Sequence, residues 1–178
     1  GKRAEEIDLI LVATCSPEQY LPCCACQVQA DIGAVNALAF DVNAACSGFL
    51  FALNTADAYL QMGLAKNALI IGSEVLSKLV DWTDRGSCIL FGDGAGAVVV
   101  EQCEASPGIL GRALHSDGTG GGVLQCGARE LTTPYAGTSA AKTDQNQPTD
   151  DREHFIQMDG QEVYRFATRR VPQCIEEA

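Results

Sequence analysis

Three short, nearly unbroken apolar runs lie in the first half of the chain, and the first two are followed by segments of helical periodicity. The runs span residues 7–14, 38–40 and 67–74. A strand that is apolar almost without alternation is typical of a sheet covered on both faces. Because strands and helices alternate, the pattern predicts a parallel sheet built from right-handed βαβ units.

The two helical segments are bounded by residues that favour helix ends. The first is expected over residues 22–32, where proline opens the helix, with Gly33 at its end. The second is expected over residues 49–62, with Gly63 at its end. The first five residues of this second helix are apolar on every side, so we expect it to be buried in a core.

Glycines at positions 92, 94 and 96 have a spacing similar to that of a dinucleotide-binding loop. Such a loop should follow a strand and open a helix. These glycines lead instead into 97–100, a run that predicts a strand, so we reject nucleotide binding here. We expect the glycines to let their backbone pass close to another element.

The pattern changes near residue 107, which predicts a first unit over residues 1–106 and a second over residues 107–178. Short strands are expected at 108–115, 123–126 and 154–158. Residues 129–153 are polar and aperiodic, and they predict a long mobile loop. A final helix is expected from Gly160 onward, with an apolar face formed by Val163, Phe166, Ala167 and Val171.

The 178 residues carry a net charge of -11 and have a pI near 4.4. This acidity argues against nucleic acid and anionic membranes as partners, because both are bound by basic faces. No apolar run reaches the length of a transmembrane span, and no charged-then-apolar leader opens the chain. The lack of an initiating Met and the helical pattern at the end predict a fragment of a longer protein.

The nine cysteines are odd in number and lie mostly in apolar runs, which favours free thiols in a reducing compartment. Cys23-Cys24-Ala25-Cys26 is the one cluster. A zinc site would need a second pair of closely spaced ligands. No such cysteine pair follows, and histidines occur only at positions 115 and 154. We therefore predict no metal site.

Cys46 is the first candidate for chemistry, because it lies between a predicted strand and the start of a predicted helix. Small neighbours permit a tight turn, and the free N–H groups at a helix start favour a thiolate. From this local context two interpretations stay open, a nucleophile and a small core residue. Trp82 and Arg85 also leave two interpretations open. They form either a pair that stacks on a ligand and binds its phosphate, or part of an ordinary exposed loop with a structural Trp.

Three motifs follow one another along the chain: Asn43-Ala44-Ala45-Cys46-Ser47-Gly48-Phe49, Asp81-Trp82-Thr83-Asp84-Arg85-Gly86 and Phe91-Gly92-Asp93-Gly94-Ala95-Gly96-Ala97. In this order and spacing they resemble β-ketoacyl-[acyl-carrier-protein] synthase III, the initiating condensing enzyme of fatty-acid synthesis. The resemblance runs from about Glu6 to the final helix. It implies the α/β thiolase-like fold, a layered αβαβα arrangement of two similar halves that packs as a homodimer in the bacterial cytoplasm or the plastid stroma.

The resemblance further implies a decarboxylative condensation of acetyl-CoA with malonyl-acyl carrier protein, through a thioester on Cys46. No cofactor is implied, because the CoA thioester is itself a substrate. Leu76 and Phe91 match residues of the acyl pocket, and Leu21 matches the residue by which a dimer partner closes that pocket. Arg165 matches a contact with the carrier protein. The positions that meet CoA are matched by Trp82, Arg85, Gly86, Leu90, Gly160 and Tyr164.

The family's catalytic His and Asn are expected to lie beyond Ala178, so the 178 residues alone are expected not to condense. They are also expected not to fold as a stable monomer, because strands that are apolar on both faces need cover that the family's second half supplies. His115 matches a non-catalytic loop position and His154 precedes the final helix, so neither is assigned as the base. Two other classes of function stay open, a thiolase-fold polyketide or alkylquinolone starter synthase and a non-catalytic CoA-binding or assembly module. A Cys-His hydrolase is disfavoured because no strand-borne His-Asp pair accompanies Cys46.

Overall fold

The structure, a computed structural model, describes residues 1–103, 108–127 and 154–178. The chain forms two compact units. The first consists of Gly1–Leu76 and Gly92–Ile109, and the second of Ser77–Phe91 and Leu110–Ala178. The loop expected at 129–153 lies outside the described residues, and the expected boundary between residues 106 and 107 stays a prediction.

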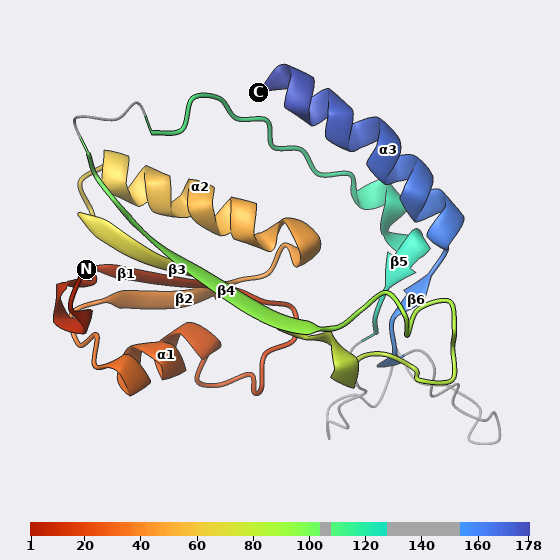
Figure 1. Cartoon of the computed structure of the whole chain (residues 1–178), viewed down its shortest axis with the longest axis horizontal. Coiled ribbons are helices and arrows are strands. Elements are labelled where there is room, and N and C mark those ends of the chain that lie inside the picture. The colour runs from red at the N-terminus through yellow and green to blue at the C-terminus, as the bar shows by residue number, and fades with distance from the viewer. Residues whose placement is uncertain (104–107, 128–153) are drawn as a thin grey trace, which may run out of the picture. The chain divides into compact units, whose positions relative to one another are not determined.

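The described part of the first unit is built on a sheet with the strand order β2-β1-β3-β4 (Figure 1). The strands β1 (Leu9–Ala13), β2 (Leu38–Val42) and β3 (Asn67–Val75) are parallel, whereas β4 (Asp93–Glu101) runs antiparallel to β3. Two helices cover the sheet, α1 (Cys24–Ile32) on one face and α2 (Gly48–Gln61) on the other. The strands and helices predicted for this half are confirmed. The predicted parallel arrangement is confirmed for β1, β2 and β3, but it is wrong for β4, so the sheet is mixed.

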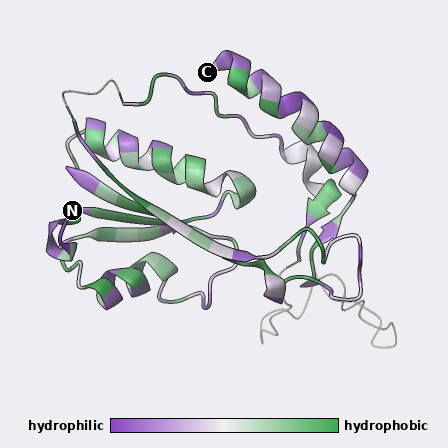
Figure 2. Ribbon diagram, viewed as in Figure 1, coloured by the Kyte–Doolittle hydropathy of each residue, from purple (hydrophilic) through white to green (hydrophobic). Residues whose placement is uncertain are grey.

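Strand β1 lies at the centre of the core, and every one of its residues is buried. Leu9 and Leu11 belong to the apolar cluster under α2, while Ile10 and Val12 belong to the cluster under α1. Successive side chains of a strand point to opposite faces, so a strand between two helical layers is apolar throughout. The hydrophobic colouring along β1 in Figure 2 follows this arrangement.

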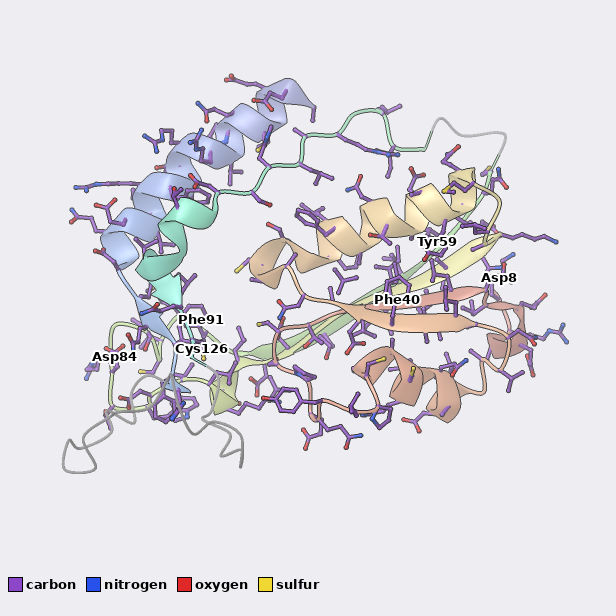
Figure 3. The ribbon with its side chains drawn as sticks, turned by 180° about the vertical axis from the view of Figure 1, so that it is seen from behind. Asp8, Phe40, Tyr59, Asp84, Phe91 and Cys126 are labelled. Carbon is purple, nitrogen blue, oxygen red and sulfur yellow. The ribbon has the colours of Figure 1, made fainter. Side chains whose placement is uncertain are left out.

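Helix α2 packs into the core along one stripe, so the expected burial is confirmed for that side of the helix only. The buried stripe consists of Gly48, Ala52, Ala56 and Leu60. Leu50, one of the apolar residues behind the expectation, is 56% exposed because it points away from the sheet. Nearer the sheet, Tyr59 faces Phe40 of β2, with 6.2 Å between the ring centroids (Figure 3).

The predicted helix ends are confirmed by the backbone conformation of two glycines. Gly33 has φ 75° and donates its N–H to the carbonyl oxygens of Ala30 and Gln29. Gly63, just after α2, has φ 69°. A left-handed residue lets the chain leave a helix while satisfying its last carbonyls, and glycine adopts this conformation without steric cost.

The glycines at positions 94 and 96 lie inside β4, and no helix follows them, so the rejection of a dinucleotide-binding loop is confirmed. The expected close approach to another element is wrong for the described residues. A Cβ built on Gly92, Gly94 or Gly96 would meet no atom within 4 Å. Because β4 is an edge strand and is largely exposed, nothing described packs against these positions.

The second unit holds a short antiparallel pair, β5 (Leu124–Gln125) with β6 (Gln157–Met158), and the helix α3 (Gly160–Glu177). The strand expected at 108–115 is wrong, since these residues form no described sheet pairing. The strands expected at 123–126 and 154–158 are confirmed only as this short pair. The helix is confirmed, and the Asp159 carboxylate accepts hydrogen bonds from two N–H groups of its first turn.

The expected apolar face of α3 is exposed in the described structure, with Phe166 and Val171 about half exposed. A helix with an apolar stripe is stabilised mainly by packing that stripe against another element. Among the described helices, none combines the length and apolar composition needed to cross a bilayer.

Candidate active site

The parallel strands of the first unit end at one edge of the sheet. Ala13, the last residue of β1, pairs with Val42 of β2 and with Gly72 of β3. Sites in parallel sheets lie beyond the carboxyl ends of the strands. Candidate site residues are therefore expected in the segments that follow β1 and β2, residues 14–16 and 43–47, and in the last residues of β3, 73–75.

Cys46 lies in a short 3-10 turn, Ala45–Ser47, between the end of β2 and the start of α2, as predicted. The residue before it, Ala45, has φ 45°, a left-handed conformation that is rare for a residue with a Cβ. Strain of this kind persists where surrounding structure holds it, and it is concentrated at functional sites. The turn leaves Cys46 exposed, which excludes the core-residue interpretation in the described structure.

The start of α2 has no cap from its own N-cap side chain. The N-cap residue, Ser47, makes no capping hydrogen bond with its side chain, and no acidic residue lies in the first turn. Helix α1 differs, because the Asp41 carboxylate accepts hydrogen bonds from the N–H groups of Cys24 and Ala25 at 2.9 and 2.7 Å. An uncapped helix start favours a thiolate or an oxyanion beside it, so the surroundings of Cys46 suit thiol chemistry.

Glu74, near the end of β3, holds the segment that follows β1. Its carboxylate accepts a hydrogen bond from the Cys15 N–H at 2.9 Å, and the Cys15 thiol lies 3.4 Å from it. The Ser16 hydroxyl also donates to Glu74, and it accepts the N–H of Val75 at 2.8 Å. Cys15, Ser16 and Glu74 were not among the predicted site residues. Their common signal is that each lies at or just beyond the carboxyl end of a parallel strand.

The environment of Cys15 disfavours its thiolate. Burial is the main cause that raises the pKa of Cys15 to about 11, followed by the charge of Glu74 and its hydrogen bond. The charge of Cys46 acts in the same direction, which sets the two cysteines near one another at this edge of the sheet. Cys15 is therefore a protonated neighbour of Cys46 at neutral pH.

Leu21 and Leu76, the predicted acyl-pocket residues of the first unit, lie in different settings. Leu21 is 85% exposed in the segment that leads into α1. Leu76 is half-buried and begins the 3-10 turn Leu76–Lys78, directly after β3. The structure thus brings Leu76 to the same strand end as Glu74, whereas Leu21 points to solvent.

In the second unit, two carboxylates order the loop that resembles a CoA-binding segment. Asp81 accepts hydrogen bonds from the N–H and hydroxyl of Thr83, and Asp84 accepts them from the Gly86 N–H at 2.9 Å and the Ser87 hydroxyl at 2.6 Å. These hydrogen bonds lower the pKa of both carboxyl groups. A Cβ on Gly86 would lie 3.2 Å from the Asp84 Oδ1 atom, so glycine suits this turn. Asp84 is labelled in Figure 3.

Three predicted CoA contacts are exposed on this loop and just beyond it: Trp82, Arg85 and Leu90. Trp82 is 66% exposed, and its indole N–H donates to the Ser77 carbonyl at 3.2 Å, which fixes the ring. An exposed aromatic ring and an exposed guanidinium on one loop suit a planar anionic ligand.

A cavity of about 590 Å³ lies beside the same loop. It is lined by Asp81, Thr83, Asp84, Phe155, Ile156, Gln157 and Met158. Its two carboxylates are ionised at neutral pH, so its interior does not suit a phosphate. A phosphate therefore suits the outward-facing Arg85 better than this cavity.

The other predicted residues of the second unit do not gather at the loop. Phe91 is half-buried at the end of the segment, and the remaining three, Gly160, Tyr164 and Arg165, lie on α3 and are exposed. Arg165 forms an ion pair with Glu162 on the same helix. His115 lies 2.6 Å from the Glu177 carboxylate and is exposed. Nothing in this arrangement gives His115 a catalytic role.

A family model described as 3-oxoacyl-[acyl-carrier-protein (ACP)] synthase III matches residues 40–118. Beta-ketoacyl-[acyl-carrier-protein] synthase III of Clostridium acetobutylicum is 48% identical over 167 residues, which cover 94% of this chain and 48% of that protein. The protein of the same name from Synechococcus sp. (strain WH7803) is 48% identical over 176 residues, covering 99% of this chain and 50% of that protein. The chain thus spans about half the length of the curated relatives it matches.

Solved structures give the same result. The 3-oxoacyl-[acyl-carrier-protein] synthase III of Aquifex aeolicus VF5 has a TM-score of 0.78 and 37% identity, covering 98% of this chain and 50% of that one. The priming beta-ketosynthase from the R1128 polyketide biosynthetic pathway has a TM-score of 0.76 and 31% identity, covering 96% of this chain and 47% of that one.

These likenesses, together with the sheet order and the turn that carries Cys46, define a chain of the thiolase-like fold. Within that class the resemblance inferred from three motifs is confirmed. The chain is related along nearly its whole length to beta-ketoacyl-[acyl-carrier-protein] synthase III.

Proposed function

We propose that the full-length protein is the initiating condensing enzyme of type II fatty-acid synthesis. It joins acetyl-CoA and malonyl-[acyl-carrier protein] to give acetoacetyl-[acyl-carrier protein], CoA and carbon dioxide. The observation that carries the proposal is the exposed Cys46 on a strained turn, next to an uncapped helix start. The relation to beta-ketoacyl-[acyl-carrier-protein] synthase III supports it.

In the first step the Cys46 thiolate attacks the acetyl carbonyl carbon of acetyl-CoA. The carbon–sulfur bond to CoA breaks, CoA leaves as a thiolate, and the acetyl group stays on Cys46 as a thioester. The oxyanion that forms during the attack needs N–H donors, and the start of α2 offers them. No cofactor enters this proposal, since the CoA thioester is the substrate.

In the second step malonyl-[acyl-carrier protein] loses carbon dioxide, and the resulting carbanion attacks the Cys46 thioester. The new carbon–carbon bond displaces the Cys46 thiolate, which is then free for another cycle. The residues that promote decarboxylation are expected outside the 178 residues. Arg165 is proposed to contact the carrier protein, and its exposure on α3 supports the proposal.

The proposed assembly is a homodimer in which Leu21 of one subunit closes the acyl pocket of the other. The exposure of this side chain supports the proposal, because an apolar residue on an open segment is stabilised by a partner that covers it. We propose the bacterial cytoplasm or the plastid stroma as the location, in keeping with bacterial relatives such as that of Clostridium acetobutylicum.

Acetyl transfer to the full-length protein tests the proposal. Incubation with radiolabelled acetyl-CoA, followed by peptide mapping, should place the label on Cys46, and Cys46→Ala should abolish it. Cys24→Ala is the matched control, because Cys24 is a half-buried thiol at the start of the other helix. Label on Cys24, or undiminished label in Cys46→Ala, would refute the assignment.

A second function is favoured by the likeness to a priming beta-ketosynthase of a polyketide pathway. That alternative keeps the Cys46 thioester but changes the acceptor. Condensation with malonyl-[acyl-carrier protein] should exceed that with malonyl-CoA if the first proposal holds. A preference for another acceptor, with the same labelling of Cys46, would favour the alternative.

A further inference from the structure

Two cysteines frame the first turn of α1. Cys23 is the N-cap residue, with an extended backbone, and Cys26 lies in the first helical turn. The Cys23 carbonyl accepts hydrogen bonds from the N–H groups of Cys26 and Gln27, at 3.1 and 3.2 Å. Residues three apart on a helix lie on the same side of it, with Cβ atoms about 5–6 Å apart. The two thiols are therefore neighbours on one side of the turn.

The side chains of the two cysteines act on one another. Cys23 is the main cause that raises the pKa of Cys26, which sets the two side chains near each other, and the Cys26 thiol donates to the carbonyl oxygen of Ala39 on β2 at 3.6 Å. Both cysteines are half-buried, so an outside reagent reaches them. A disulfide needs Cβ atoms about 3.5–4.5 Å apart, closer than two residues of one helical turn. Cys23 is the N-cap residue and lies outside the helix, so its side chain can approach Cys26 without breaking helical hydrogen bonds.

We propose that Cys23 and Cys26 form a reversible disulfide by exchange with a low-molecular-weight disulfide, so that the first turn of α1 is a thiol–disulfide exchange site. The site is separate from Cys46 and from acyl transfer, and it goes beyond the proposed function. The spacing Cys-x-x-Cys at the start of a helix is the arrangement of redox-active dithiols in general.

The exchange proceeds in two steps in which atoms and electrons balance. The Cys23 thiolate attacks one sulfur of the incoming disulfide, which releases one thiolate and leaves a mixed disulfide on Cys23. The Cys26 thiolate then attacks the Cys23 sulfur, which closes the Cys23–Cys26 bond and releases the second thiolate. The two thiols lose two electrons, the incoming disulfide gains them, and the two protons end on the released thiols.

The order of the two cysteines follows from their surroundings. Interaction with the Cys23 side chain is the main cause that raises the pKa of Cys26, with further contributions from burial and the charge of Asp41. Cys26 therefore ionises less readily than an ordinary cysteine, which suits the resolving position. Because Asp41 already occupies the start of α1, the helix end does not stabilise a thiolate there. A site without thiolate stabilisation does not favour the reduced form, so the disulfide should persist once it is formed.

Cys24 offers a matched control inside the same turn. It lies between the two thiols, packs against the buried cluster under α1, and its pKa is raised mainly by burial. Adjacent residues of a helix do not face each other, so Cys24 is not expected to pair with Cys23.

The test uses the full-length protein carrying Cys46→Ala, so that oxidation of Cys46 does not contribute. The protein is treated with glutathione disulfide, quenched in acid, alkylated with N-ethylmaleimide, digested with pepsin and analysed by mass spectrometry. The peptide containing Cys23 and Cys26 should be lighter by two hydrogen atoms and carry N-ethylmaleimide on Cys24 alone. Dithiothreitol given before alkylation should restore labelling of all three thiols.

The variants separate this bond from general oxidation. Cys24→Ser should still close the bond, whereas Cys23→Ser and Cys26→Ser should each abolish the loss of two hydrogens. Labelling of all three thiols after glutathione disulfide, or a glutathione adduct that persists on Cys23 without closure, would overturn the proposal. The peptide from the protein with all three cysteines gives this answer even where a variant fails to fold. Acetyl labelling of Cys46 is not part of the readout, so failure here leaves the proposed function untouched.

Discussion

Gly48, the first residue of α2, approaches Ala13, the last residue of β1, so closely that a Cβ built on Gly48 would lie 3.2 Å from the Ala13 Cβ. This contact sets how near the start of α2 lies to the sheet. Cys46 lies two residues before Gly48, so the same contact positions the candidate nucleophile.

Gly48→Ala should therefore disturb both the fold and the site. Overpacking of a close contact typically costs about 1–3 kcal/mol, and the helix start must shift to relieve it. We expect a lower free energy of unfolding and slower acetylation of Cys46, measured by urea titration and by acetyl labelling. Gly96→Ala is the control, since a Cβ there meets no atom within 4 Å. Equal behaviour of the two variants would show that the Gly48–Ala13 contact does not position Cys46.

The alkylation of Cys15 should depend steeply on pH. Its pKa is raised from 9.0 to about 11, so iodoacetamide should modify Cys15 slowly at neutral pH and faster as the pH approaches that value. The native state keeps this proton longer than the unfolded chain does. The stability contributed by Cys15 is therefore present below pH 9.0 and is lost as the pH rises towards about 11.

Glu74→Gln should increase the alkylation rate of Cys15 below that pH, because it removes a negative charge beside the thiol. Burial, the larger cause, remains, so the pKa should fall only part of the way. Glu101→Gln is the control, since Glu101 pairs with Lys2 at 2.6 Å. Mass spectrometry of alkylated peptides over a pH series measures both rates, and an unchanged Cys15 rate in Glu74→Gln would contradict the electrostatic account.

Arg85→Ala should weaken the binding of acetyl-CoA in the full-length protein. A charge-assisted hydrogen bond to a phosphate is typically worth about 1.5–3 kcal/mol. The KM for acetyl-CoA should rise roughly tenfold or more, with kcat less affected. Arg169→Ala, an exposed arginine on α3, serves as the control. If the KM for acetyl-CoA changes equally little in both variants, Arg85 does not bind CoA and is an ordinary exposed loop residue.

Leu21→Phe should narrow the range of primers. A leucine at the far wall of the acyl pocket leaves more room than a phenylalanine, so the unmodified protein should accept propionyl- and butyryl-CoA beside acetyl-CoA. The larger ring should shift the ratio of kcat/KM values towards acetyl-CoA. Val35→Phe, at another exposed position of the same unit, controls for added bulk. An identical primer profile in both variants would remove Leu21 from the pocket.

Local chemistry was enough to predict most elements of the first unit. The continuous apolar run of β1 predicted a strand with helices on both faces, because alternate side chains such as Leu9 and Ile10 must each be buried. Gly33 and Gly63 predicted the helix ends, because the end of a helix depends on the left-handed φ angle of the glycine itself and not on distant residues. The turn at Cys46 was predictable for the same reason, because a strand, a run of small residues and a helix are contiguous in the chain.

Where the prediction failed, long-range packing had decided the outcome. Residues 108–115 have the composition of a strand, but a strand forms only where another strand pairs with it. Leu50 is apolar and exposed, because the sheet determines which side of α2 is covered.

Long-range packing also explains why some residues beside the thiols were not predicted. Glu74 meets Cys15 from 59 positions away, and Asp41 meets Cys24 from 17 positions away. No local sequence pattern predicts such pairs, because parallel pairing of the strands brings their carboxyl ends together only after folding. The sequence by itself therefore determined the elements of the sheet and the turn that exposes Cys46. The tertiary structure decided which carboxylates stand beside the thiols, because a charge acts through space and not along the chain.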